Sequence, residues 1–147
     1  MSGIIFIASR AKHLLLLVFV FFGLASTVAF AQTCETAKSI PTGHDKLGGG
    51  SATADYDGIT KVKGGQSVYV KIKNENVLGV SYTLTIVEDT SPENPICTYK
   101  AILPPHGSVI LYGALFAEPP IAWKITVAVG PESDAGVLTY EVYSAKQ

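Results

Sequence analysis

The chain has 147 residues, of which 48% are hydrophobic and 16% are charged. Its 11 basic and 12 acidic residues nearly cancel, so no excess of positive charge exists to neutralise nucleic-acid phosphates. The hydrophobic content excludes a disordered chain, and the length suits one globular domain, with or without a targeting segment.

The first 31 residues have the pattern of a secretory signal peptide. They lack acidic residues, carry Arg10 and Lys12, and continue through an apolar run over 14–24 to small residues ending at Ala31. This order predicts cleavage after Ala31 and a secreted or periplasmic protein. The alternative is an uncleaved membrane anchor, because 14–31 is at the lower length limit for crossing a bilayer.

Two cysteines, Cys34 and Cys97, follow the signal peptide. An even pair in an oxidising compartment predicts a disulfide, which would stabilise the fold by about 4 kcal/mol by closing a long loop. A metal-binding or reactive pair is disfavoured, since the two cysteines form no C-x-x-C motif and have no histidine beside them in the sequence.

Residues 32–57 have a different composition from the rest of the chain. A short stretch before Pro41 could form one helical turn, and the Gly- and Ser-rich residues that follow it are typical of loops. We therefore expect a flexible N-terminal arm, tethered by the disulfide and able to add a strand to a neighbouring protein.

From Gly58 onward, apolar residues recur at every second position, which is the pattern of β-strands. No segment supports a long amphipathic helix, and groups of Gly, Pro, Asn and Ser separate the strands. The expected strands cover residues 58–63, 67–73, 81–88, 96–103, 108–115, 121–129 and 137–144.

Seven short strands, each with one apolar face, must bury those faces against one another. We therefore expect an all-β domain over 58–147, an antiparallel β-sandwich of about seven strands and immunoglobulin-like size, with Trp123 in its core. A small closed β-barrel is the alternative. Either architecture leaves the function open.

Catalytic motifs are missing from the sequence. There is no Gly-x-Ser-x-Gly motif, and His44 and His106 both lie in Gly- and Pro-rich segments. Ser108 follows His106 too closely for a good nucleophile and base geometry. We expect a protein that is not an enzyme and that needs no cofactor.

Asp55 and Asp57 are a weak metal candidate, because Asp-x-Asp-Gly resembles part of a calcium loop. The third oxygen ligand and the distal glutamate are missing, and Asp followed by Gly is common in turns. A turn without metal is the preferred interpretation.

Four lysines stand at odd positions of two consecutive expected strands: Lys61, Lys63, Lys71 and Lys73. If these strands pair as a hairpin through Gly64 and Gly65, the four amines line one face, which could meet an anionic glycan, lipid headgroups or an acidic partner. The preferred interpretation is that the lysines protect an exposed strand edge.

Three tyrosines, Tyr69, Tyr112 and Tyr143, point outward if Val70, Leu111 and Val142 point inward. A sugar or a protein surface can stack on tyrosines that point outward from a sheet. Cross-strand packing and strand propensity also explain tyrosines at these positions, and this interpretation is preferred.

The expected function is that of a non-catalytic binding module outside the cytoplasm. It would bind another envelope or extracellular protein, or a second copy of itself, with no nucleic acid and no membrane span after cleavage. A carbohydrate-binding module is the first alternative, if the tyrosines share a face. An enzyme or enzyme inhibitor, acting through the Pro-rich loops at 104–107 and 117–120, is the second.

Overall fold

A computed structural model describes residues 32–133 and 136–145, and within these ranges the protein is all-β, with no helix. The signal peptide, its cleavage after Ala31 and the anchor alternative fall outside the described residues. Within them, no helix has the length and hydropathy needed to cross a membrane. The strands are β1 (Gln32–Thr33), β2 (Glu35–Ala37), β3 (His44–Thr53), β4 (Gly58–Gly64), β5 (Ser67–Asn74), β6 (Val80–Glu88), β7 (Pro95–Leu103), β8 (Ser108–Ala114), β9 (Ile121–Val129) and β10 (Val137–Ala145).

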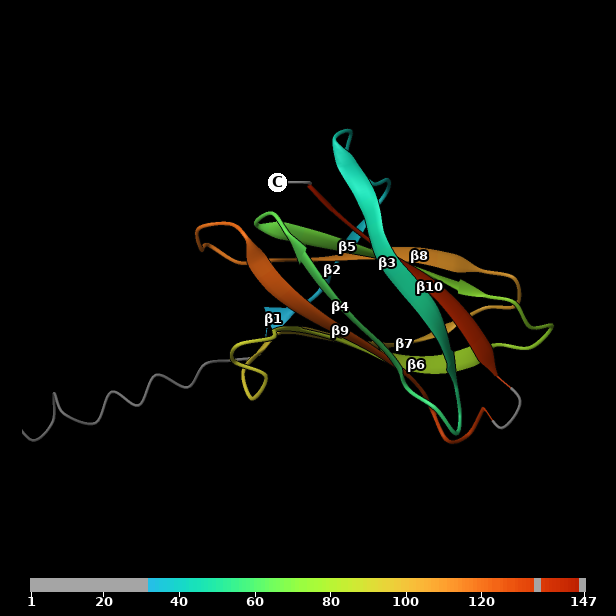
Figure 1. The fold of residues 1–147 in the computed structure, drawn as a ribbon. Helices are drawn as coiled ribbons and strands as arrows, with labels where there is room; N and C mark the ends of the chain where they lie inside the picture. The colour runs from blue at the N-terminus through green and yellow to red at the C-terminus, as the bar shows by residue number, and fades with distance from the viewer. Residues whose placement is uncertain (1–31, 134–135, 146–147) are drawn as a thin grey trace, which may run out of the picture. The chain divides into compact units, whose positions relative to one another are not determined.

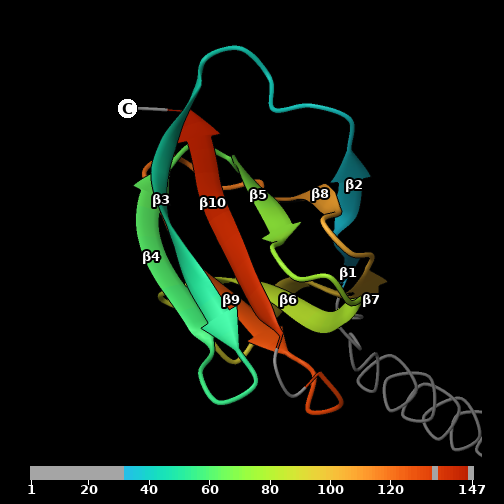
Figure 2. The ribbon, with the colours of Figure 1, turned by 90° about the vertical axis from the view of Figure 1, so that its right-hand side faces the viewer.

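The strands form two sheets that face each other (Figure 1). The first sheet has the order β1-β7-β6-β9-β4 and the second the order β2-β8-β5-β10-β3. All pairs are antiparallel except β1 with β7. Figure 2 shows the second sheet from β3 across to β2, with the first sheet beneath it. No strand pairing joins the sheets, so the arrangement is sandwich-like and the closed barrel is wrong.

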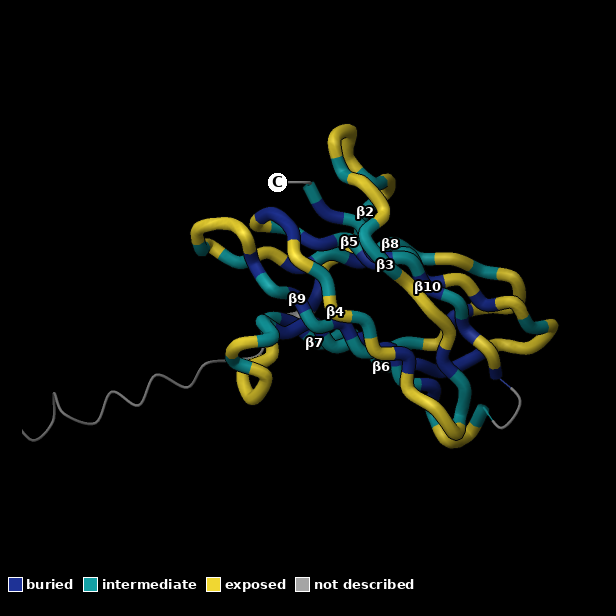
Figure 3. Tube along the Cα trace, in the orientation of Figure 1, coloured by how far each residue is buried: buried dark blue, intermediate teal, exposed yellow. Residues whose placement is uncertain are grey.

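The seven expected strands correspond to β4 through β10, with ends that agree to within one residue. The apolar residues of these strands are buried between the sheets, as the alternation predicts. Figure 3 marks the buried positions along the chain in dark blue. Trp123 lies in this core, fully buried, and its indole Nε1 donates to the Gly65 carbonyl oxygen at 3.0 Å. That bond satisfies the one polar group of the buried indole.

The expectation of a flexible arm over 32–57 is wrong for much of that segment, because it contains β1, β2 and the ten-residue strand β3. The glycines of β3 serve close packing. A Cβ on Gly48 would lie 2.8 Å from Thr60 Cγ2 of β4, and one on Gly50 would lie 3.0 Å from the Tyr140 hydroxyl oxygen. Because glycine has no side chain, these residues let the edge strand β3 approach the other sheet. In the sequence alone, the same glycines resemble a flexible linker.

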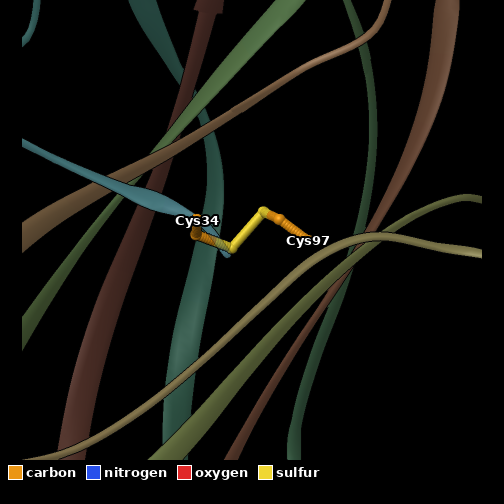
Figure 4. The surroundings of a disulfide bond; sticks show 2 residues. All are labelled: Cys34 and Cys97. Atoms are coloured by element: carbon orange, nitrogen blue, oxygen red, sulfur yellow. A yellow bond between two sulfur atoms is a disulfide. The ribbon is translucent and has the colours of Figure 1, made fainter. Parts of the chain in front are cut away.

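The expected disulfide between Cys34 and Cys97 is confirmed (Figure 4). Cys34 stands between β1, which pairs with β7 of the first sheet, and β2, which pairs with β8 of the second. The segment over 32–37 is therefore a strap along one side of the sandwich. Its two strands, β1 and β2, add to the edges of the protein's own sheets, whereas the sequence left open that the arm adds a strand to a neighbouring protein.

Candidate functional site

The outer face of the second sheet carries a row of three tyrosines. Tyr69 on β5 pairs in register with Tyr112 on β8 and with Tyr143 on β10. Their chain neighbours Val70, Leu111 and Val142 are all fully buried, so the tyrosines point outward, as the alternation predicts. The structure thus brings all three onto one face.

The three rings do not form a uniform platform. Tyr69 and Tyr112 stack on each other, with ring centroids 5.5 Å apart and planes 24° apart. His44 of β3 contacts Tyr69 edge to face at 5.0 Å. Tyr143 makes no such ring contact within the described ranges. A ligand would therefore find the ring of Tyr143 available for stacking, whereas Tyr69 and Tyr112 cover part of each other.

Two of the hydroxyl groups donate to carboxylates on the same face. Tyr112 donates to Glu35 Oε2 at 2.5 Å, and Tyr143 donates to Glu141 Oε2 at 2.8 Å. Each hydrogen bond favours the neutral phenol and so raises the pKa of its tyrosine. The pKa of Glu141 is lowered, first by its hydrogen bond from Lys46 and then by the one from Tyr143.

The four lysines do not form one row, because β4 and β5 belong to different sheets and make no hairpin. Lys61 and Lys63 lie on β4, an edge strand of the first sheet, as the edge-protection interpretation expects. Lys61 pairs with Asp89 at 2.8 Å. Lys71 and Lys73 lie on β5, the central strand of the second sheet, on the same outer face as the tyrosines.

Beside the tyrosine row, a hollow of about 590 Å³ lies on this outer face. Ion pairs border it: Lys46 with Glu141 at 2.6 Å, and Lys73 with Glu75 at 3.0 Å. Among the described residues that line the hollow there is no Val, Leu, Ile, Met or Phe. Its lining is Lys46, Gly48, Gly49, Gly50, Lys71, Lys73, Glu75, Thr139, Tyr140 and Glu141.

Sequence reasoning missed Lys46, Glu75 and Glu141 as members of this face. Lys46 reaches it through the pairing of β3 with β10, which places Tyr143 opposite Lys46 after an irregularity in register. Since β3 was expected to be a flexible arm, nothing in the local sequence indicated this partner. The nearest sequence clue is the alternation of β10, which puts Glu141 and Tyr143 on one face.

Asp55 and Asp57 lie in the tight connection from β3 to β4, as the turn interpretation expects. Both are exposed, and the Thr53 and Tyr56 backbones around Asp55 bond to each other at 2.8 and 3.2 Å. In the part of the chain that the structure describes, no group of three or more His, Cys, Asp or Glu residues could hold a metal ion.

The two histidines of the described residues, His44 and His106, lie on different elements of the fold. His106 is exposed in the turn after β7, with a left-handed φ of 53°. His44 places Nε2 at 3.4 Å from the Ser67 hydroxyl oxygen, while its buried Nδ1 has no hydrogen-bond partner. A catalytic serine needs a histidine whose second nitrogen is oriented by an acid, and His44 lacks that orientation.

Comparisons with known proteins identify no family. No family model matches the chain, and no curated protein matches it. Among solved structures, an acetyl xylan esterase from the rumen bacterium Butyrivibrio proteoclasticus aligns at 10% identity and TM-score 0.39, over 80% of this chain and 32% of the esterase. The chain thus spans about a third of that enzyme.

Two other solved structures align over most of their own length. PirA aligns at 9% identity and TM-score 0.36, over 72% of this chain and 96% of PirA. A mutant of a family 29 carbohydrate binding module aligns at 14% identity and TM-score 0.34, over 76% of this chain and 89% of that module. Identities and TM-scores this low establish neither a family nor a function for this chain.

Proposed function

We propose that the protein is a non-catalytic module outside the cytoplasm that binds a glycan on the outer face of its second sheet. The observation that carries this proposal is the cross-strand row of Tyr112, Tyr69 and Tyr143. Shared placement on one face was the condition that the sequence set for this function. Because the three tyrosines share a face, we prefer a glycan as the ligand over the protein partner that the sequence favoured.

The polar hollow beside the row favours a sugar over an apolar small molecule. Ligand pockets for apolar molecules are lined mainly by hydrophobic side chains, and this one is lined by lysines, carboxylates, threonine, tyrosine and glycine backbone. A sugar ring has hydroxyl groups that both donate and accept, which the Lys46–Glu141 pair can match. Its C–H face can lie against the ring of Tyr143.

The absence of catalysis is part of the proposal. Of the two histidines near this face among the described residues, His44 has an Nδ1 with no acid to orient it, and His106 lies in an exposed turn close enough to act electrostatically on Glu75. The location outside the cytoplasm is supported by the Cys34–Cys97 disulfide, since such bonds persist in oxidising compartments.

Affinity electrophoresis of the purified protein tests the proposal, with gels that contain neutral or acidic plant and bacterial polysaccharides. We expect retardation on at least one of them. Tyr143→Ala should weaken it by about tenfold, because an aromatic contact contributes about 1.4 kcal/mol. Tyr56→Ala is the matched control, since Tyr56 is 69% exposed in the β3–β4 connection. Unchanged migration on every polysaccharide would contradict glycan binding.

A second candidate, binding of a partner protein, is favoured by an exposed apolar end of the sandwich. Val77, Leu78 and Ile102 are 75%, 73% and 72% exposed, and Gly79 brings their segments together by lying against Ile102. Such clusters mark protein contacts, and Glu75 and Glu132 beside them favour a basic partner. The native mass of the protein from its source, with and without Leu78→Asp, tests this candidate: a larger assembly lost in the variant supports it.

A further inference from the structure

Lys71 occupies the middle of the proposed binding face. It lies on the central strand β5, between Ile110 of β8 and Glu141 of β10. It lines the 590 Å³ hollow on one side and a second hollow, of about 230 Å³, on the other. The second hollow is lined by Ala37, Lys38, Lys71, Ser108, Val109 and Ile110. A chain-like ligand that lies across the strands and fills both hollows would pass over the Lys71 amine.

The carboxylates of this face already have partners. Glu35 accepts from Tyr112, Glu75 pairs with Lys73, and Glu141 pairs with Lys46. The salt bridges within the described ranges do not include Lys71, although Glu141 is its cross-strand neighbour. Lys71 still acts on Glu141 electrostatically across the strands. The linings of the two hollows together carry four lysines, Lys38, Lys46, Lys71 and Lys73, against two glutamates, Glu75 and Glu141, so their net charge is positive.

We propose that the glycan is an acidic one, built from carboxylate-bearing sugars, and that the Lys71 ammonium binds a sugar carboxylate. This inference rests on the proposed glycan-binding function. A single ammonium group matches a singly charged carboxylate. No arginine follows Arg10 in the chain, so lysine ammonium groups are the cations available to such an anion. A sulfate ester carries the same single charge, and the comparison with dextran sulfate below distinguishes it from a carboxylate.

The surrounding groups suit the remaining parts of such a sugar. Lys46 with Glu141, and Lys73 with Glu75, offer donors and acceptors to hydroxyl groups on both sides of Lys71. Thr139 adds a hydroxyl that itself donates to Glu75 at 3.2 Å. These pairs are partly exposed, with side-chain exposures between 36% and 54%, so a ligand can reach them without breaking a buried network.

The test is the same affinity electrophoresis, in which retention of the protein is compared between each acidic polysaccharide and the same polymer after chemical reduction of its carboxyl groups to alcohols. The probes are polygalacturonate, alginate and hyaluronan, with dextran sulfate and poly-L-glutamate as other polyanions and galactomannan and xylan as neutral glycans. We expect retention on at least one of the three carboxylated glycans. Reduction of its carboxyl groups should weaken that retention by about tenfold, the effect of one charge-assisted hydrogen bond.

Variants at one lysine identify the residue that binds the carboxylate. Lys71→Met keeps an apolar stem of similar length and should weaken retention on the carboxylated glycan about tenfold, with no effect on its reduced form. Lys71→Arg should retain binding, because it keeps the positive charge. Lys63→Met is the matched control, since Lys63 lies on edge strand β4 of the other sheet. Circular dichroism verifies that each variant is folded.

The outcomes separate this inference from the function on which it rests. Equal retention on the carboxyl-reduced polymers, or retention on neutral glycans alone, would overturn the acidic ligand and leave glycan binding intact. Equal retention on dextran sulfate or poly-L-glutamate would reduce the interaction to general charge attraction and overturn the inference as well. No retention on any glycan, neutral or acidic, would contradict glycan binding itself.

Discussion

Glu141 is the residue that connects the tyrosine row to the hollow beside it. Its Oε1 accepts from Lys46 at 2.6 Å and its Oε2 accepts from Tyr143 at 2.8 Å, so one carboxylate holds a cation and a phenol from neighbouring positions of the face. The alternation of β10 predicts that Glu141 and Tyr143 share a face. It cannot predict Lys46, which lies 95 residues away in the chain.

Replacing Glu141 by Gln should lower the pKa of Tyr143 toward 10.0, the ordinary value for tyrosine. The hydrogen bond to the charged carboxylate raises that pKa because it favours the neutral phenol, and a neutral amide does so less strongly. NMR titration of the tyrosine ring signals measures the change. The pKa of Tyr112, which is raised by Glu35, should not move and is the internal control.

The hydrogen bond from Tyr143 to Glu141 also makes the free energy of unfolding depend on pH in a known direction. The pKa of Tyr143 is raised in the folded state. Its contribution to the free energy of unfolding is therefore complete below pH 10 and is lost as the pH rises through the folded pKa. Glu141, whose pKa is lowered, contributes above about pH 4.5 and loses its contribution as the pH falls through its folded pKa. A Tyr143 pKa that is the same in the protein and in Glu141→Gln would contradict this hydrogen bond.

At the scale of elements, the close approach of β3, β4 and β10 depends on glycines. A Cβ on Gly58 of β4 would lie 2.4 Å from Tyr140 Cε1 and 2.8 Å from the Ser51 carbonyl oxygen. The Tyr140 hydroxyl in turn bonds Thr60 Oγ1 at 2.8 Å, which joins β10 to β4 across the two sheets. On this side the two sheets are therefore joined by side chains, although no pairing of the described strands connects them.

Gly58→Ala should lower the free energy of unfolding by about 1–3 kcal/mol, because an added methyl group must push the Tyr140 ring or the backbone of Ser51 aside. Urea denaturation followed by tryptophan fluorescence measures it, since Trp123 is the single tryptophan and is buried. Gly79→Ala is the control. Its nearest atom would be Cγ2 of exposed Ile102, at 3.3 Å, which can move. Equal stability of Gly58→Ala and the unmodified protein would contradict the close approach.

At the scale of the whole described molecule, the strap over 32–37 covers one side of both sheets. Cys34 anchors it to Cys97, β1 extends the first sheet and β2 extends the second. The strap also delivers Glu35 to the hydroxyl of Tyr112. Loss of the disulfide would therefore affect the sandwich and the proposed binding face together.

The double variant Cys34→Ser and Cys97→Ser should lose about 4 kcal/mol of stability, the entropy of closing a loop with a sequence separation of 63. Urea unfolding of the oxidised protein and the variant measures the difference. If the unmodified protein is reduced, its stability should fall to the level of the variant. A variant as stable as the oxidised protein would show that the strap holds without its covalent link.

The sequence by itself determined where β4 to β10 run, which of their residues face inward and that the two cysteines pair. These properties follow from alternation along a strand, which is local, and from having only two cysteines in the chain. Only the tertiary structure decided that β4 and β5 belong to different sheets, that a glycine-rich segment is strand β3, and that Lys46 meets Glu141. These facts depend on which strands become neighbours, and that choice is made by packing between residues far apart in the chain.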